Sequence, residues 1–405
     1  MISTCRWQES NLVISSKPGC ITISIEKNAD IKVYSFDFSG RLWTALEGKI
    51  SFRHGLDGRT LARSKDTSGQ QSRRWLTSQD TSDLQIRSRN LVAAVLNDNN
   101  DGYIRFDPPL NEFNLLRLKK VVEFGEERSQ SDRMNFEKIY HPIGILPPDQ
   151  YMSVVLQATE GCSFNSCTFC SFYRDQQFHI KSPEEFSRHA MEVRDFLGEG
   201  ISLRKTIFLG GANALVLPME KIKPILEIIH QIFDVEALGG IFAFSDGFSG
   251  EKKSTADYIQ LAEMGIKTIY IGLESGCEDL LRFLNKPGTA DGVLNTVRNA
   301  KSAGIAVAII ILLGAGGRSF AEKHVDETIS VINQMNLDAG DMIYFSKMII
   351  SDSVPYFQDM YQANLLPLTE IEQEDQWQKI ESKFVFGDDL GTPHISIYDI
   401  RDFIF

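Results

Sequence analysis

Three cysteines lie close enough together in the chain to ligate a metal. Cys162, Cys167 and Cys170 fall in the run GCSFNSCTFCS, directly after an apolar segment. Three thiolates can hold a zinc ion with His179 as fourth ligand, or three irons of a [4Fe-4S] cluster whose fourth iron stays open. Closed zinc sites usually pair two Cys-x-x-Cys knuckles, and no second knuckle is present. The spacing therefore favours an iron-sulfur cluster, with zinc as the alternative.

Glycine-rich and acidic motifs follow three later apolar segments. The first two are GGAN at residues 210–213 and GLESG at residues 272–276. In the second, Glu274 could act at a binding site or form a surface ion pair with Lys286. The third, GAGGRS at residues 314–319, is similar to a dinucleotide fingerprint without its last glycine, so a nicotinamide site is a further alternative.

A repeating pattern of apolar strand, turn and amphipathic helix starts at Tyr151 and predicts a parallel sheet of βα units. We predict six strands, at residues 152–158, 206–209, 240–244, 268–271, 306–313 and 342–345. We predict helices at residues 183–197, 219–233, 255–264, 291–303 and 321–335, with N-caps at Ser182 and Ser254 and C-caps at Gly265 and Gly304.

Six such units can form an open doubly wound sheet or a curved partial barrel, and periodicity does not separate the two. In both folds ligands bind at the carboxyl ends of the strands, where the cysteine loop begins. Residues 1–145 read as a β-rich region of short alternating strands, and the polar residues 64–82 predict a mobile loop. A helix near residues 370–384 and a strand-like segment at 395–405 are expected to cover one edge or mouth of the sheet.

Composition and charge restrict the classes of partner. The 405 residues carry a net charge of -12, which argues against a general affinity for nucleic acid or anionic membranes. The longest strongly apolar run, residues 305–313, is shorter than the roughly 20 residues of a membrane-spanning helix. The amino terminus lacks the pattern of a secretion signal, so we expect a cytoplasmic protein with free or metal-bound cysteines.

The cysteine motif resembles that of the radical S-adenosylmethionine (radical SAM) superfamily. The usual pattern there is Cys-x-x-x-Cys-x-x-Cys with an aromatic residue before the last cysteine, and Phe169 fills that position. Cys162 and Cys167 are separated by one residue more than in that pattern, which marks a subgroup of its own. The resemblance covers about residues 151–348. It implies a partial (β/α)6 TIM-like barrel at residues 146–350, between the β-rich region at 1–145 and a short extension at 351–405.

The resemblance also implies a set of cofactor-binding residues. The turn at residues 210–213 looks like the Gly-Gly-Glu turn of the family, whose backbone binds the methionine amino group. The segment at residues 271–276 resembles a Gly-hydrophobic-Glu/Gln-Ser motif in the subgroup of the Elongator catalytic subunit and oxygen-independent coproporphyrinogen oxidase. There the acidic residue binds the ribose or the amino group of the ligand, and a basic residue pairs with the methionine carboxylate. The positions implied here are Phe169, Gly210, Gly211, Asn213, Ser245, Glu274, Ser275, Lys286 and Gly314.

The function implied by the resemblance is reductive cleavage of S-adenosylmethionine at a [4Fe-4S] cluster held by the three cysteines. The 5′-deoxyadenosyl radical so formed would abstract hydrogen from a small-molecule substrate, with flavodoxin or ferredoxin as electron donor. Cys277 could face the active cavity or be a buried free thiol. The alternatives are a zinc-stabilised α/β binding protein and a nicotinamide-dependent oxidoreductase.

Overall fold

The computed structural model describes residues 1–65, 71–387 and 391–405. The chain forms two compact units. Unit 1 comprises residues 1–141, 191–205 and 404–405, and unit 2 comprises residues 142–190 and 206–403. We describe each unit by itself.

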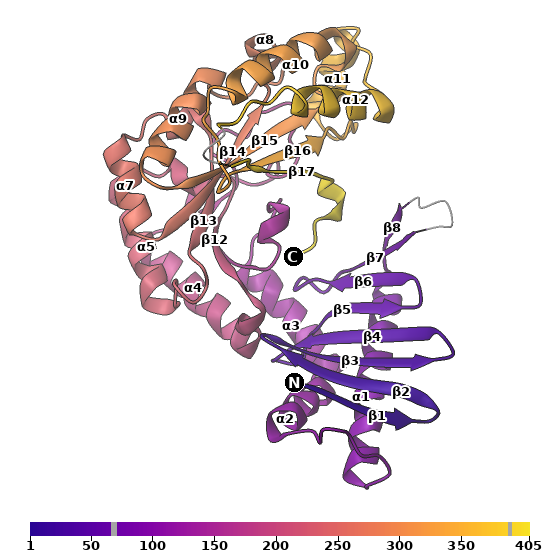
Figure 1. Ribbon diagram of the computed structural model, residues 1–405. Helices are drawn as coiled ribbons and strands as arrows, with labels where there is room; N and C mark the ends of the chain where they lie inside the picture. Colours follow the sequence, from indigo (N-terminus) through magenta and orange to yellow (C-terminus); the bar gives the residue numbers. More distant parts are fainter. Residues whose placement is uncertain (66–70, 388–390) are drawn as a thin grey trace. The chain divides into compact units, whose positions relative to one another are not determined.

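Unit 1 is built on an eight-stranded antiparallel sheet in which each strand pairs with the next along the chain (Figure 1). Its inner face is apolar because alternate residues of each strand point the same way, as Leu12 and Ile14 do. Leu84 and Val92 of the first helix belong to the same buried cluster. The elements are β1 (Ile2–Trp7), β2 (Ser10–Lys17), β3 (Cys20–Lys27), β4 (Asp30–Asp37), β5 (Leu42–Glu47), β6 (Ile50–His54), β7 (Thr60–Lys65), β8 (Gln71–Trp75), α1 (Ser78–Asn100), α2 (Glu112–Glu123) and α3 (Glu126–Ile139).

The predicted mobile loop at residues 64–82 is wrong for the described part of that segment. Strand β7 continues to Lys65, β8 follows at residues 71–75 and α1 begins at Ser78, while residues 66–70 lie outside the described residues. The polar side chains that suggested a loop instead have local partners. Thr77 caps α1 by accepting a hydrogen bond from the Asp80 N–H at 3.0 Å. The three helices of unit 1 were also not predicted by the sequence pattern.

Unit 2 contains a seven-stranded parallel sheet whose strands stand in chain order. They are β9 (Ser153–Gln157), β12 (Thr206–Gly210), β13 (Ile241–Ser245), β14 (Ile266–Glu274), β15 (Ala306–Leu313), β16 (Met342–Lys347) and β17 (His394–Tyr398). Because every strand joins the next in the same direction, right-handed crossovers put the connecting helices on one face. This order excludes a doubly wound sheet and confirms the predicted partial barrel.

The helices of unit 2 cover the outer face of this curved sheet, as α5, α7, α9 and α10 show in Figure 1. The predicted helices are present, although α10 already begins at Gly317, and Ser254 forms a capping box with Asp257. The helices are α4 (Pro183–Leu197), which runs from unit 2 into unit 1, α5 (Met219–Ile232), α6 (Gly247–Gly250), α7 (Thr255–Glu263), α8 (Glu278–Phe283), α9 (Ala290–Ser302), α10 (Gly317–Ile332), α11 (Pro355–Gln362) and α12 (Glu370–Glu381). Two short strands, β10 (Thr159–Glu160) and β11 (His179–Ile180), pair across the cysteine loop.

An aromatic layer fills the interior of the barrel. Phe208 of β12 contacts Phe244 of β13 with ring centroids 5.1 Å apart and Tyr270 of β14 at 5.8 Å. Tyr270 in turn stacks on Tyr344 of β16 at 6.5 Å, and the hydroxyl groups of both tyrosines donate to Asp149. These inward-facing rings close the barrel below the carboxyl ends of its strands.

Residues 394–398, near the carboxyl terminus, belong to unit 2 and add a strand to its sheet. Strand β17 pairs in parallel with β16, so the predicted cover of a sheet edge is confirmed, but the strand ends at Tyr398 instead of reaching residue 405. Helix α12 contacts the loop after β15, where Gln376 Oε1 accepts a hydrogen bond from the Gly314 N–H at 2.8 Å. Within the described residues, no helix has the length and apolar character needed to cross a bilayer.

Replacing Phe208 with alanine tests the aromatic layer. The ring is fully buried, so Phe208→Ala should lower the free energy of unfolding by about 3–5 kcal/mol. Phe357→Ala in α11, where the side chain is 42% exposed, should cost less than about 1 kcal/mol. Chemical denaturation followed by circular dichroism measures both values, and equal losses in the two variants would contradict this description.

Candidate functional site

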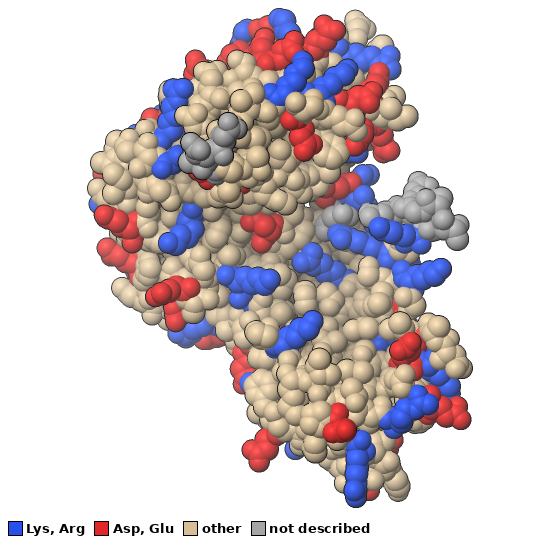
Figure 2. Space-filling view, viewed as in Figure 1, with Lys and Arg blue, Asp and Glu red and all other residues tan. Residues whose placement is uncertain are grey.

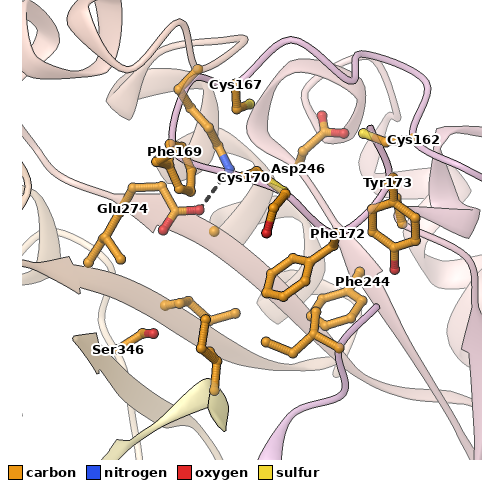
Figure 3. Close-up of a pocket in the computed structure, with 18 of the residues that line it drawn as sticks. Cys162, Cys167, Phe169, Cys170, Phe172, Tyr173, Phe244, Asp246, Glu274 and Ser346 are labelled. Atoms are coloured by element: carbon orange, nitrogen blue, oxygen red, sulfur yellow. Dashed lines mark hydrogen bonds and ion pairs between the residues drawn. The ribbon is translucent and has the colours of Figure 1, made fainter. Parts of the chain in front are cut away.

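A cavity of about 300 Å³ lies at the carboxyl ends of the barrel strands. Its walls come from the cysteine loop and from the ends of β13, β14, β15 and β16, and Phe244 and Tyr344 of the aromatic layer lie at its base. The position is the one at which parallel α/β barrels place their chemistry. Most of the lining is apolar, with a few polar groups among the rings (Figure 3).

Cys162, Cys167 and Cys170 all line this cavity (Figure 3). All three are free and partly exposed. Burial raises the pKa of the Cys167 thiol to about 12 and also raises the pKa of Cys170. Both are therefore neutral thiols in the metal-free protein, and a bound metal would replace their protons.

The longer spacing between the first two cysteines is accommodated by a turn at Asn165. This residue has a φ of 49°, in the left-handed region that asparagine tolerates better than most residues. Its N–H lies 3.4 Å from Cys162 Sγ, and its side-chain amide donates to the Tyr173 carbonyl at 2.8 Å. The turn folds the additional residue back so that all three cysteines face one cavity.

The cysteine loop is fixed by hydrogen bonds from its own chain and from the segment after α8. Arg174 donates to the carbonyls of Cys170 at 2.7 Å and Cys167 at 2.5 Å. The Thr168 N–H donates to the Leu284 carbonyl at 2.9 Å, and the Asn285 side chain donates to the Ser166 carbonyl at 2.8 Å. The loop is thus tied to the short segment that carries the next functional residue, Lys286.

Glu274 and Lys286 form a buried ion pair on the cavity wall. Lys286 Nζ lies 2.8 Å from Glu274 Oε1, and the two side chains are only 15% and 10% exposed. Burial opposes the charge of Lys286, but the Glu274 carboxylate outweighs it and raises the pKa of the lysine. The alternative of a surface ion pair is therefore wrong, and the cavity contains a fixed cation beside the cysteines.

Gly272 leaves the space in which this ion pair lies. A Cβ atom at this position would overlap Glu274 Oε1 and come within 2.8 Å of Lys286 Nζ. The glycine itself lines the cavity, as Glu274 does two residues later. No role for this glycine could be predicted from the sequence, because a side chain here would overlap with groups that include Lys286, which follows α8.

Several other predicted site residues reach the cavity. Phe169, Asn213 and Ser245 line it. Asn213 is held by hydrogen bonds from its side-chain nitrogen to Asp246 and to Ser249 Oγ, the latter at 3.0 Å. Its Oδ1 atom is buried and has no partner among the described residues, so it can accept a hydrogen bond from a ligand.

The other predicted residues do not belong to the lining of this cavity, namely Gly210, Gly211, Ser275 and Gly314. Gly211 has a φ of 91°, and its backbone lies so close to Thr159 that any side chain would overlap that residue. The glycine pair therefore turns the chain from β12 toward Asn213. Ser275 is fully buried, and its hydroxyl lies 2.7 Å from His324 Nδ1 instead of facing the cavity.

Gly314 lies outside the cavity lining, and the carboxyl-terminal segment covers the loop after β15. The N–H groups of Gly314, Gly316 and Arg318 donate to Gln376 Oε1, Tyr356 Oη and the Leu366 carbonyl, respectively. These donors are the ones that a dinucleotide phosphate would need. The nicotinamide alternative therefore finds no support in this loop.

The remaining candidates from the sequence are also placed by the structure. Cys277 is fully buried in an apolar cluster with Leu280 and Met360, so it is a buried free thiol and not part of the cavity lining. His179, the fourth ligand of the zinc alternative, is 49% exposed and lies 3.5 Å from Glu185. Among the described residues, no three His, Cys, Asp or Glu side chains are close enough to hold a single metal ion.

Some lining residues were not predicted at all. Asp246 follows Ser245 at the end of β13, and its carboxylate caps α6 by accepting from the Ser249 N–H at 2.6 Å. Its position directly after a strand was a signal that sequence analysis could have used. Tyr398 lines the cavity from β17, more than a hundred residues after the cysteine loop in the chain. No local sequence pattern predicts this contact.

The donor set fits an iron-sulfur cluster better than a single metal ion. Three thiols from one loop line the cavity, none is in a disulfide, and a lysine ammonium lies beside them to balance the negative charge of a thiolate-bound cluster. Three protein ligands leave one iron for another molecule. The unpartnered Asn213 Oδ1 and the Glu274–Lys286 pair line the same cavity and offer both an acceptor and a cation to such a molecule.

Comparison with known proteins gives a family match over residues 156–330, which match the model of the Radical SAM superfamily. The chain is 24% identical over 221 residues to the heme chaperone HemW of Bacillus subtilis, covering 53% of this chain and 55% of that protein. It is 22% identical over 247 residues to the tRNA-2-methylthio-N(6)-dimethylallyladenosine synthase of Clostridium novyi, covering 58% of this chain and 52% of the synthase. The chain thus spans about half the length of each of these curated relatives.

Among solved structures, the coproporphyrinogen III oxidase HemN of Escherichia coli aligns with a TM-score of 0.45 at 14% identity, covering 64% of this chain and 56% of HemN. Methylornithine synthase aligns with a TM-score of 0.38 at 18% identity, covering 57% of this chain and 63% of that chain. The family match includes all three cysteines and ends within α10. Residues 156–330 are therefore a radical SAM domain, the domain of enzymes that use a [4Fe-4S] cluster and S-adenosylmethionine.

Proposed function

We propose that this protein cleaves S-adenosylmethionine reductively and uses the resulting radical to abstract hydrogen from a small-molecule substrate. Cys162, Cys167 and Cys170 would hold the cluster. The bound cluster supplies the electron that splits S-adenosylmethionine into methionine and a 5′-deoxyadenosyl radical. The observation that carries the proposal is that three free thiols and a buried, paired lysine line the same cavity.

The residues beside the cysteines can bind the charged groups of S-adenosylmethionine. Lys286 offers an ammonium for the methionine carboxylate, in a buried position where charge-assisted hydrogen bonds are strong. Asn213 Oδ1 offers an acceptor for the amino group, and Glu274 offers a carboxylate to the amino group or the ribose hydroxyls. Ser245 lies on the same wall and is the second ribose candidate.

The remaining wall suggests the kind of substrate. Phe172, Tyr173, Tyr344 and Tyr398 line the cavity with ring surfaces, and such a lining excludes water and suits a compact, largely apolar molecule. On the face of unit 2 in Figure 2, acidic and basic side chains are interspersed, and no broad basic surface suited to nucleic acid is seen there. The names of the two curated relatives refer to heme and to tRNA, so they do not select one substrate.

A one-electron donor is required by this chemistry, and we propose flavodoxin or ferredoxin in a reducing cytoplasm. All six cysteines are free, which agrees with such an environment. No observation favours the zinc-stabilised binding protein, because His179 lies on the surface and apart from the three thiols. The nicotinamide enzyme is equally unsupported, since the loop at residues 314–319 is covered by its own chain.

Replacing a cluster ligand tests the proposed function. After anaerobic reconstitution, the native protein should hold about four irons and release 5′-deoxyadenosine when S-adenosylmethionine and a reductant are added. Cys167→Ala should stay folded but lose its iron and reduce this release by at least about a hundredfold. Cys5→Ala in unit 1 should behave like the native protein. A colourless native protein with one tightly bound zinc would refute the proposal.

Replacing Gly272 tests the role of the ion pair. In Gly272→Ala, the added methyl group pushes Glu274 away from Lys286, so S-adenosylmethionine should bind about tenfold more weakly while the iron content stays unchanged. Gly125→Ala serves as the control, since no atom of the described residues lies within 4 Å of the added Cβ. Equilibrium dialysis of the reconstituted proteins gives both affinities. Native affinity in Gly272→Ala would show that the pair does not take part in binding.

A further inference from the structure

Glu274 occupies a strained turn at the end of β14. Its φ is 60°, and the Ser275 N–H donates to the Leu273 carbonyl at 2.7 Å, which closes a three-residue turn around the glutamate. Turns of this kind with positive φ are rare, and for a residue other than glycine the conformation is costly. The register with β15 also shifts between Gly272 and Glu274. Such a turn persists only where its surroundings hold it in place.

Helix α10 supplies the groups that hold the turn. The Gly276 N–H donates to Thr328 Oγ1 at 2.9 Å, and Ser275 Oγ lies 2.7 Å from His324 Nδ1. Ser275 Oγ also accepts from the Cys277 N–H at 3.0 Å. Gly276 is therefore bonded to Thr328, and Ser275 to His324, one turn earlier on α10. Cys277 is linked to His324 through the Ser275 hydroxyl.

His324 is a neutral imidazole whose Nδ1 can accept hydrogen bonds from two hydroxyls. The imidazole is fully buried, and burial lowers its pKa to about 4. The hydroxyls of Ser275 and Thr328 each accept a backbone N–H, and each can still donate its own hydrogen to Nδ1, which lies 2.7 Å and 3.3 Å away. Nε2 has no partner among the described residues. A buried unpaired nitrogen is unfavourable, and an apolar side chain at this position would avoid that cost. The presence of a histidine is therefore explained by the contacts of Nδ1.

We propose that His324 and Thr328 are positioning residues that hold the turn with Glu274 aimed at Lys286 and the cavity. Neither residue belongs to the cavity lining, so both act through residues 275–277: Thr328 through the Gly276 N–H and His324 through the Ser275 hydroxyl. The inference rests on the proposed function, because the turn around Glu274 then serves to bind S-adenosylmethionine. Without these two contacts the turn relaxes, and the carboxylate is no longer held in its binding position.

Two variants remove the contacts with little change of shape. His324→Leu keeps a large buried side chain but has no acceptor, and Thr328→Val removes the hydroxyl that binds Gly276. Hydrogen exchange in the metal-free protein should become about tenfold faster at residues 275–277 in both variants. Thr296→Val is the matched control, since that buried hydroxyl donates to Gly292 within α9 and does not contact the turn.

A rescue variant separates the hydrogen bond from simple packing. The side-chain oxygen of asparagine can take the place of Nδ1, so His324→Asn should restore slow exchange more fully than His324→Leu. In the reconstituted proteins, the two disruptive variants should bind S-adenosylmethionine about tenfold more weakly, with native iron content and a native maximal rate at saturating ligand. Thr328→Val carries the test if His324→Leu does not fold.

The outcomes distinguish this inference from the proposed function. Native exchange rates at residues 275–277 in both variants would overturn it. Variants that lower the melting temperature but bind S-adenosylmethionine with native affinity would overturn it as well. If the native protein releases no 5′-deoxyadenosine, the proposed function fails, while the exchange measurement in the metal-free protein still decides whether α10 holds the turn.

Discussion

The buried ion pair between Glu274 and Lys286 is the constraint on which the site depends. Two charges in a largely apolar cavity are stable only when they are paired at short distance, and the loss of either partner would leave the other uncompensated. Lys286 lines the same cavity as Cys167, so one cation is shared between a carboxylate and the proposed cluster site. A site of this kind can exchange part of its internal pairing for the carboxylate and amino groups of a ligand.

Hydrogen bonds to backbone groups next to Glu274 and Lys286 bring the groups of the site together. Leu284 and Asn285 bind the cysteine loop, and the next residue is Lys286 itself. On the opposite side, Glu274 follows a register shift in β14 and is held in its turn from α10. Helix α12 contacts the loop that leads into α10, where the Gly314 N–H donates to Gln376 Oε1.

The sequence predicted those parts of the structure that depend on neighbouring residues. The six core strands are short apolar runs, and the cap at Ser254 is a local signal, so both were found. The cysteine loop was also readable, since its ligands are close together in the chain. The predicted mobile loop failed because Ser64 of β7 and Ser72 of β8 form a hydrogen bond between neighbouring strands and Thr77 caps α1.

Site residues that depend on distant contacts could not be assigned in this way. Ser275 and Gly314 belong to motifs of the right kind, yet His324 and Gln376 bind them from elements that follow later in the chain. Tyr398 lines the cavity only because β17 returns to the sheet beside β16. The additional residue between Cys162 and Cys167 is likewise explained only by the turn at Asn165, which needs the Tyr173 carbonyl as a partner.

We propose above all that the three cysteines hold a cluster with one open iron, which binds S-adenosylmethionine in this cavity. Electron paramagnetic resonance of the reduced, reconstituted protein tests it most directly, with S-adenosylmethionine that carries an isotopic label on its amino nitrogen. The account predicts that adding the ligand changes the cluster signal and that the labelled nitrogen couples magnetically to the iron. A cluster signal that S-adenosylmethionine leaves unchanged would contradict it.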